Sequence, residues 1–117
     1  MKRDMDLIRA ILLKVEEQDA EGSATIEIPG YSREQVFCHA ELAQEAGFIL
    51  ASFRAGYSVR VQRLTFAGHE FLDAARQDKL WEKAKQTVLH NAGTLTVEAL
   101  KTALSMLMQQ AVRGMIA

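Results

Sequence analysis

The sequence is poor in cysteine and has no long apolar run. Its single cysteine, Cys38, excludes an internal disulfide and is compatible with a reducing cytosol. No apolar run approaches the roughly 20 residues that span a bilayer, and the chain starts with an amphipathic segment instead of the apolar segment of a signal peptide. We therefore expect a cytoplasmic protein without a membrane partner.

The chain also has no excess of charge of either sign. A formal net charge of -1 at pH 7 gives no global attraction to nucleic acid, so any DNA binding must come from local basic clusters. With 117 residues, of which 49% are hydrophobic, the chain can bury the core of one compact domain.

Motifs that mark common enzymes and metal sites are missing. The sequence contains no glycine-rich phosphate loop, no Gly-x-Ser-x-Gly turn and no nucleophile with a base at a recognisable spacing. Cys38 and His39 are adjacent, so on a helix their side chains point about 100 degrees apart and cannot share a metal ion without distortion. We expect no enzymatic activity, no cofactor and no metal site.

Capping residues and apolar spacing predict the helices. Asp4 can cap a first helix that continues to about Gln18, and Ser32 begins a capping box with Gln35. The second helix should run from Arg33 to Ala46, because Gly47 is a typical C-terminal stop. Three further helical segments are expected to begin at Thr65, Asp78 and Thr96, with a break at residues 90–93.

Two regions have strand-like patterns. Residues 25–28 alternate like a short half-buried strand between the loop-like residues 19–24 and a Pro-Gly turn. Residues 48–54 and 57–64 flank Ala55-Gly56, a spacing that suits a tight hairpin. The order of a helix, a short strand, a helix and a two-stranded wing predicts an α+β winged-helix-like domain with additional C-terminal helices. We expect a single domain over 1–117, with its core in 1–64, supporting helices in 65–92 and an amphipathic helix in 94–117.

Three segments resemble a known family. They are MKRDMDLIR, EIPGYSREQVFCHAELAQEAGFI and RLTFAGHEFLDAARQDKLWEKAK, which together belong to roughly the first 90 residues. They are similar to a family of short bacterial and phage-borne proteins, domain-of-unknown-function family 2513. The resemblance implies a winged-helix-like fold and a bacterial or prophage setting. It implies no activity.

A small set of basic and polar residues forms the candidate site. Arg54 is expected at the wing tip, Arg60 on the return strand and Arg33 in the first turn of the second helix, where backbone amides also favour a phosphate. Tyr57 could add a hydrogen bond from the wing. His39 could contact a phosphate or could pack as a structural residue, and the second role is favoured.

The leading hypothesis is therefore a DNA-binding or regulatory protein of phage or mobile-element origin. The acidic residues of the second helix, Glu34, Glu41 and Glu45, oppose it because they would repel a phosphate backbone. The alternative is a protein-interaction module without nucleic-acid binding.

The last helix carries a long apolar stripe. The stripe covers some five turns, and a core completed before residue 90 has limited room to bury it. We expect part of it to form a homodimer contact, with packing on its own domain as the alternative. Trp81 is expected to be a core anchor between the third helical segment and the first helix and not an exposed base-stacking residue, because Leu80, Ala84 and Val88 accompany it at helical spacing.

Overall fold

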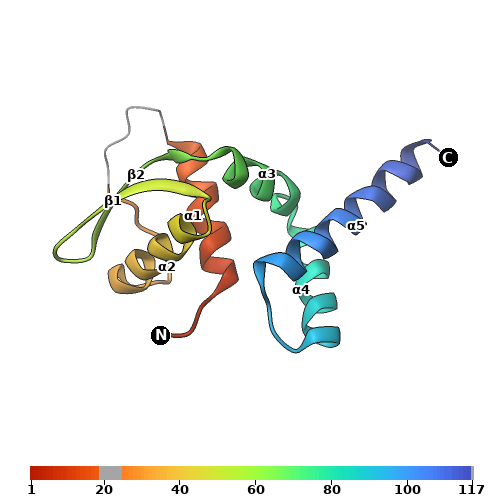
Figure 1. Cartoon of the computed structure of the whole chain (residues 1–117), viewed down its shortest axis with the longest axis horizontal. Coiled ribbons are helices and arrows are strands. Elements are labelled where there is room, and N and C mark those ends of the chain that lie inside the picture. Colours follow the sequence, from red (N-terminus) through yellow and green to blue (C-terminus); the bar gives the residue numbers. More distant parts are fainter. Residues whose placement is uncertain (19–24, 117) are drawn as a thin grey trace. The chain divides into compact units, whose positions relative to one another are not determined.

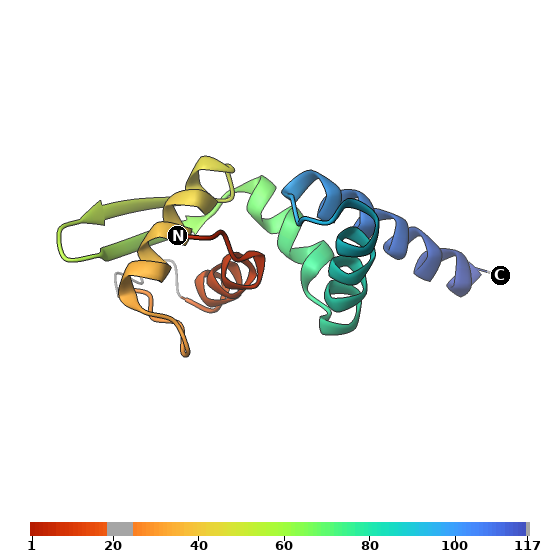
Figure 2. The same ribbon diagram turned by 90° about the horizontal axis from the view of Figure 1, so that it is seen from below.

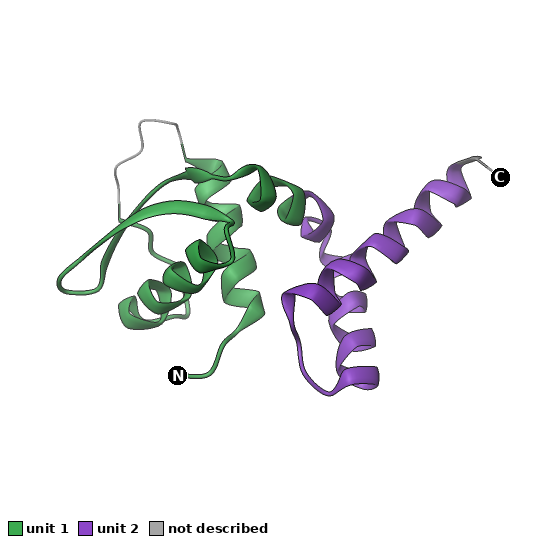
Figure 3. Cartoon of the chain, in the orientation of Figure 1, with its two compact units in different colours: residues 1–72 green, residues 73–117 purple. Residues whose placement is uncertain are grey.

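The structure is a computed structural model that describes residues 1–18 and 25–116 (Figure 1, Figure 2). Its contacts divide the chain into two compact units, Met1–Leu72 and Asp73–Ala117 (Figure 3). Over the described ranges, the elements are helices and one two-stranded antiparallel sheet, which confirms the α+β class. The division falls within α3, inside the region expected to hold supporting helices, and each unit is described by itself below.

Helix α1, Met5–Glu17, begins at the predicted cap. The carboxylate of Asp4 accepts hydrogen bonds from the backbone N–H groups of Asp6 and Leu7, which would otherwise lack partners in the first turn. The apolar face of the helix is buried at helical spacing. The residues buried on it are Met5, Leu7, Ile8, Ile11, Leu12 and Val15.

Helix α2, Arg33–Glu45, also confirms its prediction. Both hydrogen bonds of the capping box are present, from Gln35 N to Ser32 Oγ and from Ser32 N to Gln35 Oε1. After the helix, Gly47 has a φ of 83°, a left-handed conformation that suits glycine at a helix end. The chain can then turn directly into the sheet.

The hairpin pairs β1, Ile49–Arg54, with β2, Ser58–Leu64 (Figure 1). Its loop end projects past the helices of the first unit in both views (Figure 1, Figure 2). The loop is Ala55-Gly56-Tyr57, one residue longer than predicted, because Tyr57 adopts a left-handed φ of 56° instead of joining the strand. The predicted two-residue turn was therefore wrong.

A bulge changes the side-chain alternation of the hairpin. Leu50 pairs with Arg63 and Ala51 pairs with Val61, so Gln62 has no residue opposite it. Side chains on one face are buried or half-buried, and we call this the inner face: Ile49, Ala51, Phe53, Val59, Val61 and Leu64. Side chains on the other face are exposed, and we call this the outer face: Leu50, Ser52, Arg54, Arg60, Gln62 and Arg63.

The predicted strand at residues 25–28 is not formed in the structure. Ile26 and Ile28 are buried and Glu27 is exposed, so the expected alternation is present. No strand ladder is formed by this segment with any described residue, although the side chain of Thr25 approaches β2, with its Oγ1 3.5 Å from Ser58 Oγ. An alternation of apolar and polar residues predicts which side chains are buried, whereas a strand also requires hydrogen bonds to a neighbouring backbone. The predicted loop at 19–24 lies outside the described residues.

Helix α3, Phe66–Ala75, is anchored to the start of the hairpin. Thr65 caps it, accepting a hydrogen bond from Gly68 N and donating one to the carbonyl of Gly47. Phe71 stacks on Phe48 with ring centroids 4.8 Å apart. Gly68 allows this close approach, because a Cβ there would lie 2.0 Å from the Phe48 carbonyl oxygen.

The second unit pairs α4, Asp78–Ala92, with α5, Val97–Ile116 (Figure 3). Gly93 ends α4 in a left-handed conformation, as the predicted break requires. Trp81 is 1% exposed, which confirms its predicted burial. Leu100 and Leu104 of α5 are fully buried, but no residue from 105 to 115 is. Among the described helices, none has the length and hydropathy needed to cross a membrane.

Candidate nucleic-acid interface

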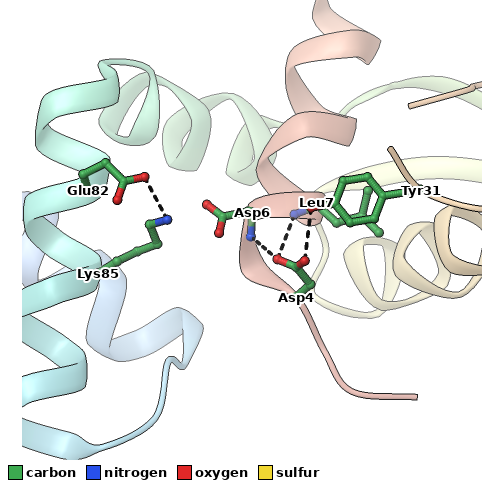
Figure 4. A network of polar contacts seen from close by, with 6 residues as sticks. All are labelled: Asp4, Asp6, Leu7, Tyr31, Glu82 and Lys85. Atoms are coloured by element: carbon green, nitrogen blue, oxygen red, sulfur yellow. Dashed lines mark hydrogen bonds and ion pairs between the residues drawn. The ribbon is translucent and has the colours of Figure 1, made fainter. Parts of the chain in front are cut away.

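Asp4 links three distant parts of the first unit. Besides capping α1, its carboxylate accepts a hydrogen bond from the hydroxyl of Tyr31 at 3.1 Å (Figure 4). Its backbone N–H donates to His39 Nε2 at 2.8 Å. The first two segments that carry the family resemblance therefore meet in one structural network.

His39 is a buried structural residue. Its side chain is 2% exposed, and its Nδ1 lies 2.8 Å from the carbonyl oxygen of Gln35. Since Nε2 accepts from Asp4, the ring is the neutral tautomer that carries its proton on Nδ1 and donates it to that carbonyl. Neither ring nitrogen is left for a phosphate, and the structural role that the sequence favoured is the one this geometry supports.

Part of the third family segment is explained by packing. Leu64 is buried, Thr65 caps α3, and Gly68 sits against the backbone of Phe48. Phe71 then fills the core beside Phe48. These four residues hold α3 against the hairpin, whereas Phe66, His69 and Glu70 of the same motif are exposed.

Arg54 and Arg60 lie on the outer face of the hairpin, as the strand register requires. Arg60 pairs with Ser52, two residues before Arg54 on β1, so the two guanidinium groups project from neighbouring strands on one side. Residues 48–64 contain three arginines and no Asp or Glu. Neither Arg54 nor Arg60 forms an ion pair with any residue that the structure describes.

The third arginine, Arg63, was missed by the sequence analysis. It lies on the outer face only because of the bulge, and its Nη1 donates to the carbonyl of Leu64 at 3.0 Å. One signal could have revealed it. Val59, Val61 and Leu64 cannot all point to one side of a regular strand, so their spacing already requires an extra residue before Leu64.

Tyr57 lies at the hairpin loop, where its ring packs against α2. Phe37 of α2 makes edge-to-face contacts with both Phe53 and Tyr57, at centroid distances of 5.2 and 5.6 Å. The Tyr57 side chain is still 47% exposed. Tyr57 therefore fixes the hairpin loop to α2, while part of its side chain stays exposed to water.

Arg33 lies on α2, which packs against the other side of the hairpin. The contact of Phe37 with Phe53 places α2 on the inner face, because Phe53 alternates with the outer-face residues Ser52 and Arg54. The structure therefore groups Arg54 and Arg60 on one face and separates them from Arg33. The exposed acidic residues of α2 share the side of Arg33: Glu34, Glu41 and Glu45.

A second feature of this unit is a groove of about 670 Å³ between the end of α1, residues 25–31 and the start of α2. Its lining combines charges of both signs, from Lys14, Glu27 and Arg33. No group of three His, Cys, Asp or Glu side chains within the described ranges could hold a metal ion. The outer face of the hairpin, in contrast to this groove, carries charged residues of one sign, all of them arginines.

Comparisons with known proteins support the resemblance. The model of the family described as "Hypothetical protein (DUF2513)" matches residues 2–94. A protein of Haemophilus influenzae described as "Uncharacterized protein" is 41% identical over an alignment of 106 residues that covers 86% of this chain and 90% of that protein. No solved structure matches this chain. Since the family model covers most of the sequence, the chain belongs to the DUF2513 family.

Proposed function

We propose that this protein is a small DNA-binding regulatory protein that contacts duplex DNA through the outer face of its hairpin. Arg54 and Arg60 provide the contacts to backbone phosphates. The family resemblance, which extends to phage-borne proteins, favours a bacterial or prophage setting. The winged-helix-like order of elements is consistent with this role, although the same scaffold also supports other functions.

The observation that carries the proposal is the one-sided charge of the hairpin. Arg54 and Arg60 are exposed on one face, and neither is neutralised by an acidic residue among those described. Guanidinium groups match phosphate oxygens in geometry and charge, and such contacts supply most of the affinity in non-specific DNA binding. A net charge of -1 does not oppose binding when the cations are gathered on one surface.

The test is duplex binding measured by fluorescence anisotropy at about 50 mM salt and repeated as salt is raised. We expect binding that weakens steeply with salt and is largely lost in the double variant Arg54→Ala/Arg60→Ala. The matched control is Lys79→Ala/Lys83→Ala, which removes two exposed positive charges from α4 and should bind like the wild type. Absence of binding to any duplex at low salt, or equal loss in both variants, would contradict the proposal.

A second candidate function is supported by the end of α5. Four apolar side chains there remain exposed: Met106 by 57%, Met108 by 40%, Val112 by 52% and Met115 by 85%. An apolar surface of this kind typically marks a contact with another protein, and a homodimer is the simplest form.

The homodimer proposal is tested by light scattering on the intact chain at micromolar concentration. We expect a dimeric mass that becomes monomeric in Val112→Glu/Met115→Glu, while Lys79→Ala/Lys83→Ala leaves the mass unchanged. A monomeric intact chain would end the homodimer proposal and leave a different protein as the partner for this surface.

A further inference from the structure

We infer that the DNA backbone runs along the outer face of the hairpin, with Arg63 as a third phosphate contact, and that α2 does not face the DNA. This inference rests on the proposed function and specifies its geometry. It differs from helix-led docking, in which a helix and the wing approach the duplex together.

The bulge in β2 brings Arg63 to the same face as Arg54 and Arg60, so that the three arginines form a row. In a regular strand, Arg63 would alternate with Arg60 and point to the inner face, and Leu64 would point outward. The unpaired residue Gln62 shifts the alternation by one, so Arg63 is exposed and Leu64 is 3% exposed in the core. The same bulge therefore places Leu64 in the core and Arg63 on the outer face.

The bulge is held in place from α2. The side-chain oxygen of Gln44 accepts a hydrogen bond of 2.7 Å from the backbone N–H of Ala51, at the position where the register shifts. Arg63 is itself oriented by the hydrogen bond from its Nη1 to the carbonyl of Leu64. That bond uses one of the five N–H donors of the guanidinium group, and the others suit a phosphate.

The three arginines form an ordered row. Arg54 is on β1, Arg60 pairs with Ser52 and Arg63 pairs with Leu50. Neighbouring arginines in the row are therefore two residues apart along β1. The row then spans about 13 Å, with about 6.6 Å between neighbouring arginines, a spacing close to that of consecutive phosphates along one DNA strand. One backbone strand can therefore meet all three side chains.

The position of α2 explains how an acidic helix is compatible with DNA binding. The helix packs on the inner face through Phe37, so the hairpin lies between the exposed acidic residues of α2 and a ligand on the outer face. Docking through α2 would instead bring Glu41 and Glu45 towards phosphates. Contacts to the backbone carry no direct sequence information, so unrelated duplexes of equal length should bind with similar affinity.

The test compares Arg63→Ala with Glu41→Gln/Glu45→Gln in the same salt titration. We expect Arg63→Ala to lower the slope of log affinity against log salt by about 1, as one lost phosphate contact does. The α2 variant should raise affinity by less than about twofold, because screened charges on the far side act weakly. Circular dichroism should show that both variants keep the wild-type fold.

The outcomes separate this inference from the proposed function. If Arg54→Ala/Arg60→Ala loses binding but Arg63→Ala keeps the wild-type slope, the proposed function through Arg54 and Arg60 stands and the third phosphate contact at Arg63 is wrong. A rise of tenfold or more in Glu41→Gln/Glu45→Gln would overturn the outer-face geometry, since α2 would then face the duplex. If the wild type binds no duplex, both ideas fail together.

Discussion

Replacing Gly68 with alanine places a methyl group against the backbone that links α2 to the hairpin. The added Cβ would lie 2.0 Å from the carbonyl oxygen of Phe48 and 2.9 Å from its carbonyl carbon, whereas ordinary contacts begin near 3.4 Å. Backbone atoms cannot rotate away as a flexible side chain can. Helix α3 must therefore move away from the hairpin by more than 1 Å.

Two effects of opposite sign determine how Gly68→Ala changes the free energy of unfolding. Alanine is favoured over glycine inside a helix by about 1 kcal/mol. Overpacking of this kind costs about 3 kcal/mol, because moving α3 also disturbs the Phe48–Phe71 stack and the cap at Thr65. We expect a net loss of about 2 kcal/mol in the free energy of unfolding, a large share of the stability of a small protein.

Urea denaturation followed by circular dichroism measures this loss as a lower midpoint at an unchanged slope. The matched control is Gly114→Ala in α5, where a Cβ meets no atom within 4 Å among the described residues. This control should be as stable as the wild type or more stable by up to about 1 kcal/mol. Wild-type stability in Gly68→Ala would refute the packing that we derive for the RLTFAGHEFL segment.

Three further predictions concern side chains that are buried or half-buried. His39→Leu leaves the N–H of Asp4 without its acceptor, and urea denaturation should show a loss of about 2 kcal/mol, with no loss counting against the network. Tyr31→Phe removes the hydroxyl group that donates to the Asp4 carboxylate and should cost about 1 kcal/mol, less than His39→Leu. Trp81 should give blue-shifted fluorescence that acrylamide quenches poorly, whereas solvent-like emission from the folded protein would contradict its burial.

Local chemistry predicts most of the helical fold. Ser32 and Gln35 form the expected capping box, Asp4 caps α1, and Gly47 ends α2 in a left-handed conformation. These features depend on residues within one turn of each other, so the sequence contains the information directly. The hairpin was found for the same reason, because two strand-like runs flank a short glycine-containing loop.

Features that depend on distant partners could not be predicted. Residues 25–28 alternate correctly, yet a strand requires a neighbouring backbone, which alternation does not specify. Tyr57 takes a left-handed conformation that its residue type disfavours, and its contact with Phe37 comes from another element. The winged-helix assignment itself remains a prediction, since no solved structure matches the chain.

The candidate site also combines features that are evident in the sequence with features that depend on distant partners. The charges of Arg54 and Arg60 are evident in the sequence, but the face that each side chain occupies depends on strand register. A single unpaired residue, Gln62, brings Arg63 to that face. The burial of His39 depends on Asp4, which is 35 residues away, so the helix pattern alone left its role open.

The most direct test of the outer-face account is a titration of the isotope-labelled protein with a short duplex, observed through the arginine Nε–Hε signals by NMR. Each arginine reports its own contact, so the experiment identifies the binding face without relying on loss of function. We expect the signals of Arg54, Arg60 and Arg63 to shift at low salt while that of Arg33, on α2, stays in place. Shifts at Arg33 alone, or no shift at any of the four, would contradict the account.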